Sequence, residues 1–381
     1  MQKFSYHDIV DMIWGATLLG GGGGGSSLNG MDLLERYMAG HGLSEEDISV
    51  DVIEPEEMED GAYAAVTAGM GAPTAIKDVD FSKYATNAFE LMQEFVLPQK
   101  VSYSMAVELG GFNTFVPMLI SLEKKIPFVN TDGAARAVPA LPTLLLHVNG
   151  NDTSPLVMAN AYDGENEYDK VTIRLKDAKD AALAENLARG VCIAFKMLSG
   201  LCGWMTEKET IKKTLPAGTV TLSQKVGSVL RDGSVSDKFA KLSEAGVVKC
   251  REFARGAVTG GGNVQEKGFD FGFIEVTDAK SGVVWRIEFQ NENLVLSTGG
   301  GKIGEVKMTA PDIICCYNSD DSTPLTNADF FDGDGKLVKQ NVVIGAVKVD
   351  EKWWITGEER VASVWKEYFG HVNYDGPIVK Y

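Results

Sequence analysis

Residues 101–133 read VSYSMAVELGGFNTFVPMLISLEKKIPFVNTDG, and this stretch decides the fold. Two short apolar runs, Val101–Val107 and Ile126–Asn130, have the length of buried strands, and the amphipathic stretch Phe115–Lys125 between them predicts a helix. Strands that alternate with helices are typical of a mostly parallel sheet whose two faces are covered. We therefore expect an α/β fold in this part of the chain.

The same alternation extends from the N-terminus to about residue 175. Ser5 and Asp8 form a capping box that predicts the start of an amphipathic helix, which runs into Gly20–Gly25 and precedes a second helix ending near Gly40. Further strands are expected at Ala62–Ala68, Pro155–Tyr162 and Lys170–Leu175. We therefore assign residues 1–175 to an α/β domain with a mostly parallel sheet, flanking helices and glycine-rich loops at its strand ends.

Beyond Pro216 the pattern changes to short β-branched runs separated by turn residues. The predicted strands are Thr219–Leu222, Val247–Ala254, Phe271–Val276, Val283–Phe289, Val342–Val349 and Trp353–Ile355. Their spacing is typical of an all-β sandwich or barrel. We therefore assign residues 176–381 to a β-rich second domain, which begins with a helix expected over Ala181–Gly200.

The charge balance restricts the partners of the protein. Asp and Glu number 53 against 36 Lys and Arg, which gives a formal net charge of -17. This excess repels phosphate backbones and anionic lipid, so we expect no nucleic acid and no membrane as a partner, although a local basic cleft could still take an anionic substrate. The start of the chain has no leader pattern, and the five cysteines have no CxxC spacing. These features predict a soluble, cytoplasmic protein.

The glycine run Gly20–Gly25 is the most unusual segment. A dinucleotide fingerprint requires a strand before the glycines, whereas a helix is expected here, and no Gly-Lys-Ser/Thr follows as in a Walker A loop. A glycine loop that leads into a helix can still offer backbone N–H groups to an anion. We therefore regard Gly22, Gly23 and Gly24 as candidate substrate-binding residues. A tight connecting loop with no ligand is the alternative.

Polar residues follow two neighbouring predicted strands. Asp132 ends one strand and Arg136 follows about one turn later, whereas Glu108 and Asn113 follow the strand before it. Because ligands bind beyond the carboxyl ends of such strands, we expect these four residues to face one pocket. Arg136 would hold a carboxylate or a ring oxygen, and Asp132 or Glu108 would activate water. A structural Asp–Arg pair that braces the loop is the alternative.

Histidine is scarce, and its spacing shows no metal motif. The chain has four histidines: His7, His41, His147 and His371. None has HExxH or His-x-His spacing, so a metal site would have to be assembled from distant residues. A divalent metal such as zinc therefore stays open as a cofactor, with no ligand motif in the sequence.

Several segments carry a resemblance to a known family. They are Gly20–Gly25, Gly69-Met70-Gly71-Ala72-Pro73, Glu108-Leu109-Gly110-Gly111, Asp132–Pro142, Phe289–Leu294, Pro311–Ile314 and Phe369-Gly370. Together they resemble the S-methyl thiohydantoin desulfurase-like family over essentially the whole chain, and the Asp-Gly-x-x-Arg-Ala-x-Pro pattern is the most specific part. Val138 stands where the family usually has Phe, Ser26-Ser27 where it commonly has Asp-Pro, and His371 where it often has Tyr.

The resemblance implies a two-domain, hydrolase-like enzyme that acts on a small cyclic amide, a hydantoin or S-methyl thiohydantoin type ring. Water would attack the ring carbon that bears sulfur and release a thiol. A hydantoinase/oxoprolinase-type enzyme is the implied partner, and the rival hypothesis is a non-catalytic protein that binds such an enzyme or a small anion. A homo-oligomer also stays open.

The motifs of the second domain lie far along the chain from the α/β loops. We expect the β-rich domain to cover the crevice and to bring Asn291 or His371 to its rim. Ordinary turn chemistry is the alternative for both segments.

Overall fold

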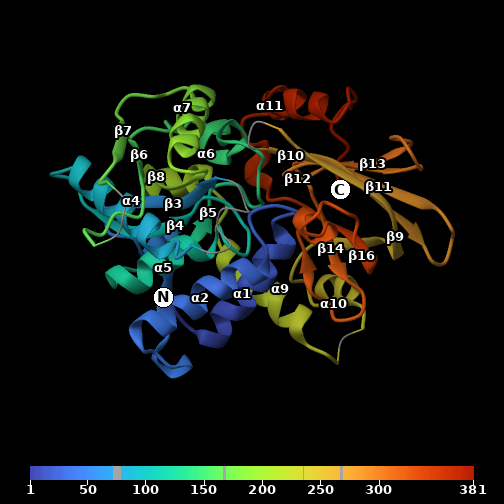
Figure 1. Ribbon diagram of the computed structural model, residues 1–381, viewed down its shortest axis with the longest axis horizontal. Helices are drawn as coiled ribbons and strands as arrows, with labels where there is room; N and C mark the ends of the chain where they lie inside the picture. The colour runs from blue at the N-terminus through green and yellow to red at the C-terminus, as the bar shows by residue number, and fades with distance from the viewer. Residues whose placement is uncertain (72–78, 166–168, 235, 267–268) are drawn as a thin grey trace.

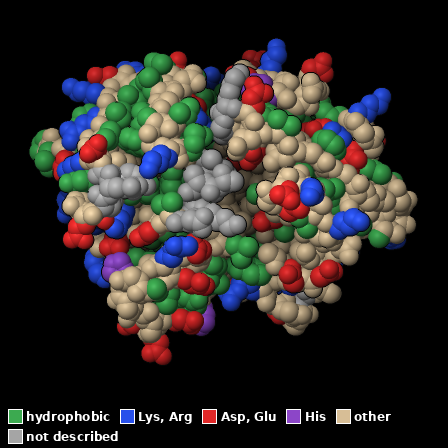
Figure 2. Space-filling model, viewed as in Figure 1, with side chains coloured by type: hydrophobic (Ala, Val, Ile, Leu, Met, Phe, Trp, Pro, Cys, Tyr) green, Lys and Arg blue, Asp and Glu red, His purple; other side chains and the backbone are tan. Residues whose placement is uncertain are grey.

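The computed structural model describes residues 1–71, 79–165, 169–234, 236–266 and 269–381. Two sheets lie side by side, the first built mainly from the N-terminal half of the chain and the second from residues beyond 250 (Figure 1). On the face shown in Figure 2, Lys and Arg side chains are interspersed with Asp and Glu. No helix in the described ranges is long and apolar enough to cross a membrane.

The first sheet combines a parallel centre with antiparallel edges. Its strands within the described residues are, in sheet order, β1 (Gln2–Ser5), β2 (Ser49–Ile53), β5 (Phe128–Asp132), β4 (Val101–Ala106), β3 (Tyr63–Gly71), β8 (Leu198–Glu207), β6 (Leu156–Ala159) and β7 (Thr172–Leu175). β2, β5, β4 and β3 pair in parallel, whereas β1 on one edge and β8, β6 and β7 on the other pair antiparallel. The expected parallel α/β sheet is therefore confirmed for the core of this domain.

Helices cover both faces of the first sheet. One face carries α1 (Tyr6–Leu19), α2 (Ser27–His41), α4 (Ser82–Phe95) and α5 (Phe115–Lys124). The other face carries α6 (Leu145–Val148) and α7 (Ala181–Ala194), and α11 (Glu358–His371) from the end of the chain packs against the same apolar cluster. The side chains of β3 alternate between the two clusters, since Val66 belongs to one and Ala65 to the other.

The second sheet is antiparallel throughout its described strands. They are, in sheet order, β13 (Val306–Thr309), β12 (Glu292–Thr298), β11 (Val284–Gln290), β10 (Phe269–Asp278), β9 (Cys250–Glu266), β16 (Asn341–Val347), β14 (Ile313–Asn318) and β15 (Pro324–Leu325). The β-rich part is confirmed, but these strands form one sheet and not a sandwich of two. One face of this sheet packs on α1, α9 (Thr219–Arg231) and α10 (Lys238–Glu244). The apolar side chains of the other face, from β9 to β16, form a cluster with one another.

Two predicted strands are helical in the structure. Thr219–Leu222 is the first turn of α9, which packs along α1, because Val220, Val226 and Leu230 form a buried helical face. Trp353 lies in a short 3-10 helix, Glu351–Trp354, where its fully buried ring packs in the core. In both places tertiary packing outweighs the weak strand preference of β-branched and aromatic residues.

The remaining elements are short. They are α8 (Lys208–Thr214) and 3-10 helices at Glu45–Asp47, Pro55–Glu57, Leu141–Thr143 and Asn327–Phe330. The capping box of Ser5 and Asp8 is confirmed, since Oγ of Ser5 accepts the N–H of Asp8 at 3.4 Å and Oδ2 of Asp8 accepts the N–H of Ser5 at 2.9 Å. The helix expected over 181–200 ends at Ala194, and β8 then joins the first sheet although it lies beyond residue 175. Residues 72–74, where the loop after β3 was expected to continue, lie outside the described residues.

Candidate functional site

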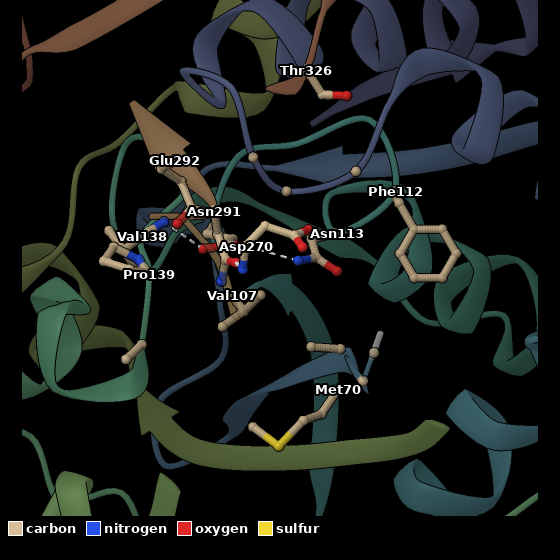
Figure 3. A pocket seen from close by; sticks show the side chains of 18 of the residues that line it. Met70, Val107, Phe112, Asn113, Val138, Pro139, Asp270, Asn291, Glu292 and Thr326 are labelled. Carbon is tan, nitrogen blue, oxygen red and sulfur yellow. Dashed lines mark hydrogen bonds between the residues drawn. The ribbon is translucent and has the colours of Figure 1, made fainter. Parts of the chain in front are cut away.

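A cavity of about 210 Å³ lies at the carboxyl ends of the parallel strands β3, β4 and β5. Its lining includes the α1–α2 loop, the ends of β3 and β4, the loop after β5, and α7. The opposite wall comes from the second sheet, through Asp270, the β11–β12 hairpin and residues 326–328. In Figure 3, Asn291 and Glu292 lie on the side of Val138 and Pro139, with Met70 on the far side. The cavity is therefore where open α/β sheets place ligands, and the second sheet covers it.

The glycine loop lines this cavity with backbone. Gly22, Gly24 and Gly25 have φ values of 94°, 72° and 82°, which other residues adopt only with strain. Gly23 is required for a different reason, because a Cβ at this position would overlap Oε1 of Glu292. Among the described residues, no acceptor takes a hydrogen bond from the N–H groups of Gly22–Gly25. Successive N–H groups of this kind can face an electron-rich ligand atom.

Glu108 lies in the cavity lining and is held at both carboxyl oxygens. Its Oε1 accepts a hydrogen bond from Nδ2 of Asn113 at 2.7 Å, and its Oε2 accepts one from the N–H of Val138 at 2.8 Å. Burial raises the pKa of Glu108 to about 7, although these two hydrogen bonds act in the opposite direction. A carboxyl with this pKa can take up or release a proton near neutral pH.

Glu292 is a second carboxyl in the same cavity, and it is not among the site residues expected from the sequence. It is the first residue of β12, its side chain is buried, and its Oε2 has no hydrogen-bond partner among the described residues. Burial, and then the negative charge of Glu108, raises its pKa well above the ordinary value. The available signal was an acidic residue within the polar run Gln290-Asn291-Glu292-Asn293. Two carboxyls of different pKa in one cavity are typical of a general acid and a general base.

Asn291 also lines the cavity, where it forms the tip of the β11–β12 hairpin. Its φ is 54°, in the left-handed region that Asn tolerates. Its backbone N–H donates to the carbonyl of Asp270 at 2.7 Å, and its Oδ1 accepts the N–H of Asp270 at 2.9 Å. Nδ2 of Asn327 donates to the carbonyl of Asn291 at 2.7 Å. These bonds fix the hairpin tip that presents Glu292.

Asp132, contrary to expectation, is not part of the cavity lining. It ends β5 with a fully buried side chain, and its Oδ2 accepts the N–H groups of Ala134 and Ala135 at 2.8 and 2.6 Å. Burial raises its pKa to about 7. The contacts of this carboxyl shape the loop after β5, and its catalytic role stays a prediction.

Arg136 is likewise absent from the cavity lining and turns toward the second sheet. Its guanidinium is fully buried and donates to four backbone carbonyls, those of Ala137, Pro311, Asp312 and Asn293, at 2.7 to 3.0 Å. The expected pocket of Asp132 and Arg136 with Glu108 and Asn113 therefore contains only the latter two. Arg136 differs from expectation because three of the carbonyls that its guanidinium binds lie in the second sheet or its loops.

His371 lies behind the hairpin and not in the cavity lining. Its Nδ1 is 2.8 Å from Oε1 of Gln290, the residue before Asn291, and its ring packs against Phe271 and Tyr368. Of the two residues expected at the rim, Asn291 is therefore the one that reaches it. His371 contacts the same hairpin from outside.

Further polar residues complete the lining. Glu185 and Arg189 of α7 form an ion pair with 2.6 Å between Oε1 and Nε, and Glu185 also accepts the N–H of Leu141 at 3.2 Å. The described residues contain no group of three or more His, Cys, Asp or Glu side chains arranged to hold a metal ion.

Family models match nearly the whole chain. Residues 7–169 match the model described as S-Me-THD-like, N-terminal domain, and residues 178–377 match S-Me-THD-like, C-terminal domain. The two matches agree with the fold, in which an α/β domain is followed by a β-rich domain and the cavity lies between their two sheets. The chain is a member of the S-Me-THD-like family, the S-methyl thiohydantoin desulfurase-like proteins that its motifs resemble.

A solved structure has the same fold. It is the X-ray crystal structure of a protein from Chromobacterium violaceum, which is 21% identical, with a TM-score of 0.82 over 100% of both chains. At this identity the likeness shows the fold alone. No curated protein matches this chain.

Proposed function

We propose that this chain hydrolyses an S-methyl thiohydantoin type ring in the cavity between the two sheets. Water adds to the ring carbon that bears sulfur, the C–S bond breaks, and methanethiol leaves a hydantoin ring behind. The oxygen of water stays on the ring carbon, one of its protons ends on the thiol and the other on a ring nitrogen. The observation that carries the proposal is the pair of buried carboxyls, Glu108 and Glu292, in one cavity.

The two carboxyls divide the proton transfers. Glu108 receives hydrogen bonds at both oxygens, which favours its ionised form, so it acts as the general base that deprotonates water. The pKa of Glu292 is raised well above its ordinary value, and one of its oxygens has no partner among the described residues, so it is the general acid that protonates the leaving sulfur or the ring nitrogen. Asn113 orients Glu108.

The glycine loop supports the same reaction. As water adds, negative charge develops on the ring atoms next to the attacked carbon, and preorganised N–H groups stabilise such charge. Gly22, Gly23 and Gly24 present N–H groups that have no acceptor in the described part of the chain. We assign them to substrate binding.

A second candidate function rests on these same N–H groups. A protein that binds a small anion, or a hydantoinase/oxoprolinase-type partner, would need the glycine loop but not the carboxyl pair. Its ligand would bind equally well to variants that lack Glu108 or Glu292. A measurement of substrate turnover therefore distinguishes the two functions, because only the hydrolase releases a thiol.

The test is thiol release from synthetic S-methyl thiohydantoins, followed with a thiol-reactive dye. We expect turnover by the wild type and a loss of about 10²-fold or more in kcat for Glu108→Gln, because a general base contributes about that factor. Asp270→Asn is the matched control, since Asp270 lines the same cavity outside the carboxyl pair. No thiol from any ring, together with a stable complex with a hydantoinase-type enzyme, would favour the second function.

A further inference from the structure

Arg136 connects the two walls of the cavity through its side chain. Nη2 donates to the carbonyl of Asn293, the residue after Glu292, and Nη1 donates to the carbonyls of Pro311 and Asp312, each at 3.0 Å. Pro311 and Asp312 immediately precede β14. The guanidinium therefore holds the start of β12, where Glu292 lies, and the start of β14 together.

The backbone of Arg136 is attached to the opposite wall. Its carbonyl accepts the N–H of Leu109, the residue after Glu108, at 3.3 Å. Two residues further on, the N–H of Val138 binds Oε2 of Glu108 at 2.8 Å. The backbone of Arg136 is therefore hydrogen-bonded next to Glu108, and its side chain is hydrogen-bonded next to Glu292.

We infer that Arg136 is a positioning residue, which fixes the strand bearing Glu292 against the loop bearing Glu108 and supplies the positive charge that both carboxyls share. The inference rests on the proposed function for its kinetic consequence. It assigns Arg136 no contact with substrate, in contrast to the role expected from the sequence.

The charges around these groups give the direction of the effect. The charges of Glu108, Arg136 and Arg189 act on the pKa of Glu292, and those of Asp132 and Arg136 act on the pKa of Glu108. The charges that act on Arg136 in turn are those of Glu292, Asp312, Glu108 and the Cys315 thiol. Its positive charge lowers the pKa of Glu108 and of Glu292 from the still higher values that burial alone would give. Removal of this charge should therefore raise both pKa values.

Two substitutions separate charge from geometry. Arg136→Met removes the charge, whereas Arg136→Lys keeps it but offers three donors without the planar fork that reaches several carbonyls at once. Trp353→Phe is the matched control, because the indole N–H donates to the carbonyl of Ala134 at 2.8 Å in the same interface without any charge. All three variants should unfold at lower temperature than the wild type.

The pKa values of the two carboxyls are measured by 13C NMR titration of protein labelled at the glutamate carboxyl carbons. The variants Glu108→Gln and Glu292→Gln assign the two resonances. We expect Arg136→Met to raise the pKa of Glu108, because it removes a positive charge that favours the ionised carboxyl. The acid limb of the pH profile of kcat/KM should move upward by the same amount. Arg136→Lys should keep the pKa of Glu108, shift the Glu292 resonance and lower kcat about 10-fold or more. Trp353→Phe should change neither carboxyl.

The outcomes distinguish this inference from the proposed function. The positioning role would be overturned if Arg136→Met folds and both carboxyls titrate as in the wild type. It would also be overturned if the Glu292 resonance of Arg136→Lys is the same as in the wild type. If Arg136→Met does not fold, the Glu292 resonance of Arg136→Lys alone tests the positioning role. Because the titration needs no substrate, absence of thiol release in the wild type would reject the proposed function and leave the positioning role testable.

Discussion

At the residue scale, the site depends on carboxyls that are buried before any ligand enters. Burial raises the pKa of Glu108 and of Asp132 to about 7 and that of Glu292 well above its ordinary value. Such groups are neutral in the fold at pH values where they are ionised in the unfolded chain. Their contribution to stability is therefore complete below the unfolded pKa values near 4 and is lost as pH rises through about 7.

Asp132→Asn tests this linkage apart from catalysis. Asparagine keeps an oxygen for the N–H groups of Ala134 and Ala135 but cannot ionise. The wild-type free energy of unfolding should fall between about pH 4 and pH 7, by about 4 kcal/mol for this one group, and the variant should lack that part of the fall. Urea unfolding across this range measures it, with the exposed Asp47→Asn as control. An unchanged pH slope in Asp132→Asn would contradict the burial argument.

At the element scale, the packing of α9 on α1 explains why a predicted strand is a helix. A Cβ at Gly15 would overlap the backbone of Ser223, and a Cβ at Gly227 would overlap the backbone of Asp11. Backbones can approach this closely only where side chains are absent. Glycine inside a helix is otherwise unfavourable, so local preference gave no indication of the contact. The helix forms because the crossing buries Val220 and Val226.

Gly227→Ala should therefore destabilise the protein by about 1–3 kcal/mol, the usual cost of overpacking. Gly190→Ala in α7 is the control, because a Cβ there meets no other atom within 4 Å. That control should be neutral or stabilise by about 0.5–1 kcal/mol, since alanine is the better helix former. Denaturant midpoints measure both, and equal effects of the two substitutions would show that the close crossing has no energetic role.

At the scale of the whole molecule, the cavity depends on how the second sheet docks on the first. The placement of Glu108 and Asn113 could be predicted from the sequence, because the carboxyl ends of parallel strands meet at one edge of a sheet. The glycine loop is a candidate for a different reason, since a run of glycines before a helix can offer free N–H groups. Glu292 could not be placed in this way, since it enters the cavity from a hairpin of the second sheet. The direction of the Arg136 side chain depends on the same docking, because its partners Asn293, Pro311 and Asp312 all lie in the second sheet or its loops. Long-range contacts of this kind leave no local pattern.

The composition of the whole cavity predicts the ring substituents that it accepts. The described lining contains four carboxyl groups, those of Glu108, Glu185, Asp270 and Glu292, against Arg189, which is already paired with Glu185. Apolar side chains such as Met70, Leu141 and Leu201 form the rest. We expect rings with an apolar substituent to have a kcat/KM about 10-fold or more above rings with a carboxylate substituent, because Arg189 is already paired with Glu185 and a buried negative charge without a partner is costly. Equal values across such a series would show that these charges do not select the substrate.

The most direct test of the central claim is hydrolysis in H₂¹⁸O. Wild-type protein with an S-methyl thiohydantoin should yield one methanethiol per ring consumed and a hydantoin product heavier by one ¹⁸O, as measured by mass spectrometry. Glu108→Gln, matched in fold by its circular dichroism spectrum, should give neither product at a comparable rate. Hydantoin without ¹⁸O, or equal turnover by Glu108→Gln, would contradict water attack assisted by the carboxyl pair.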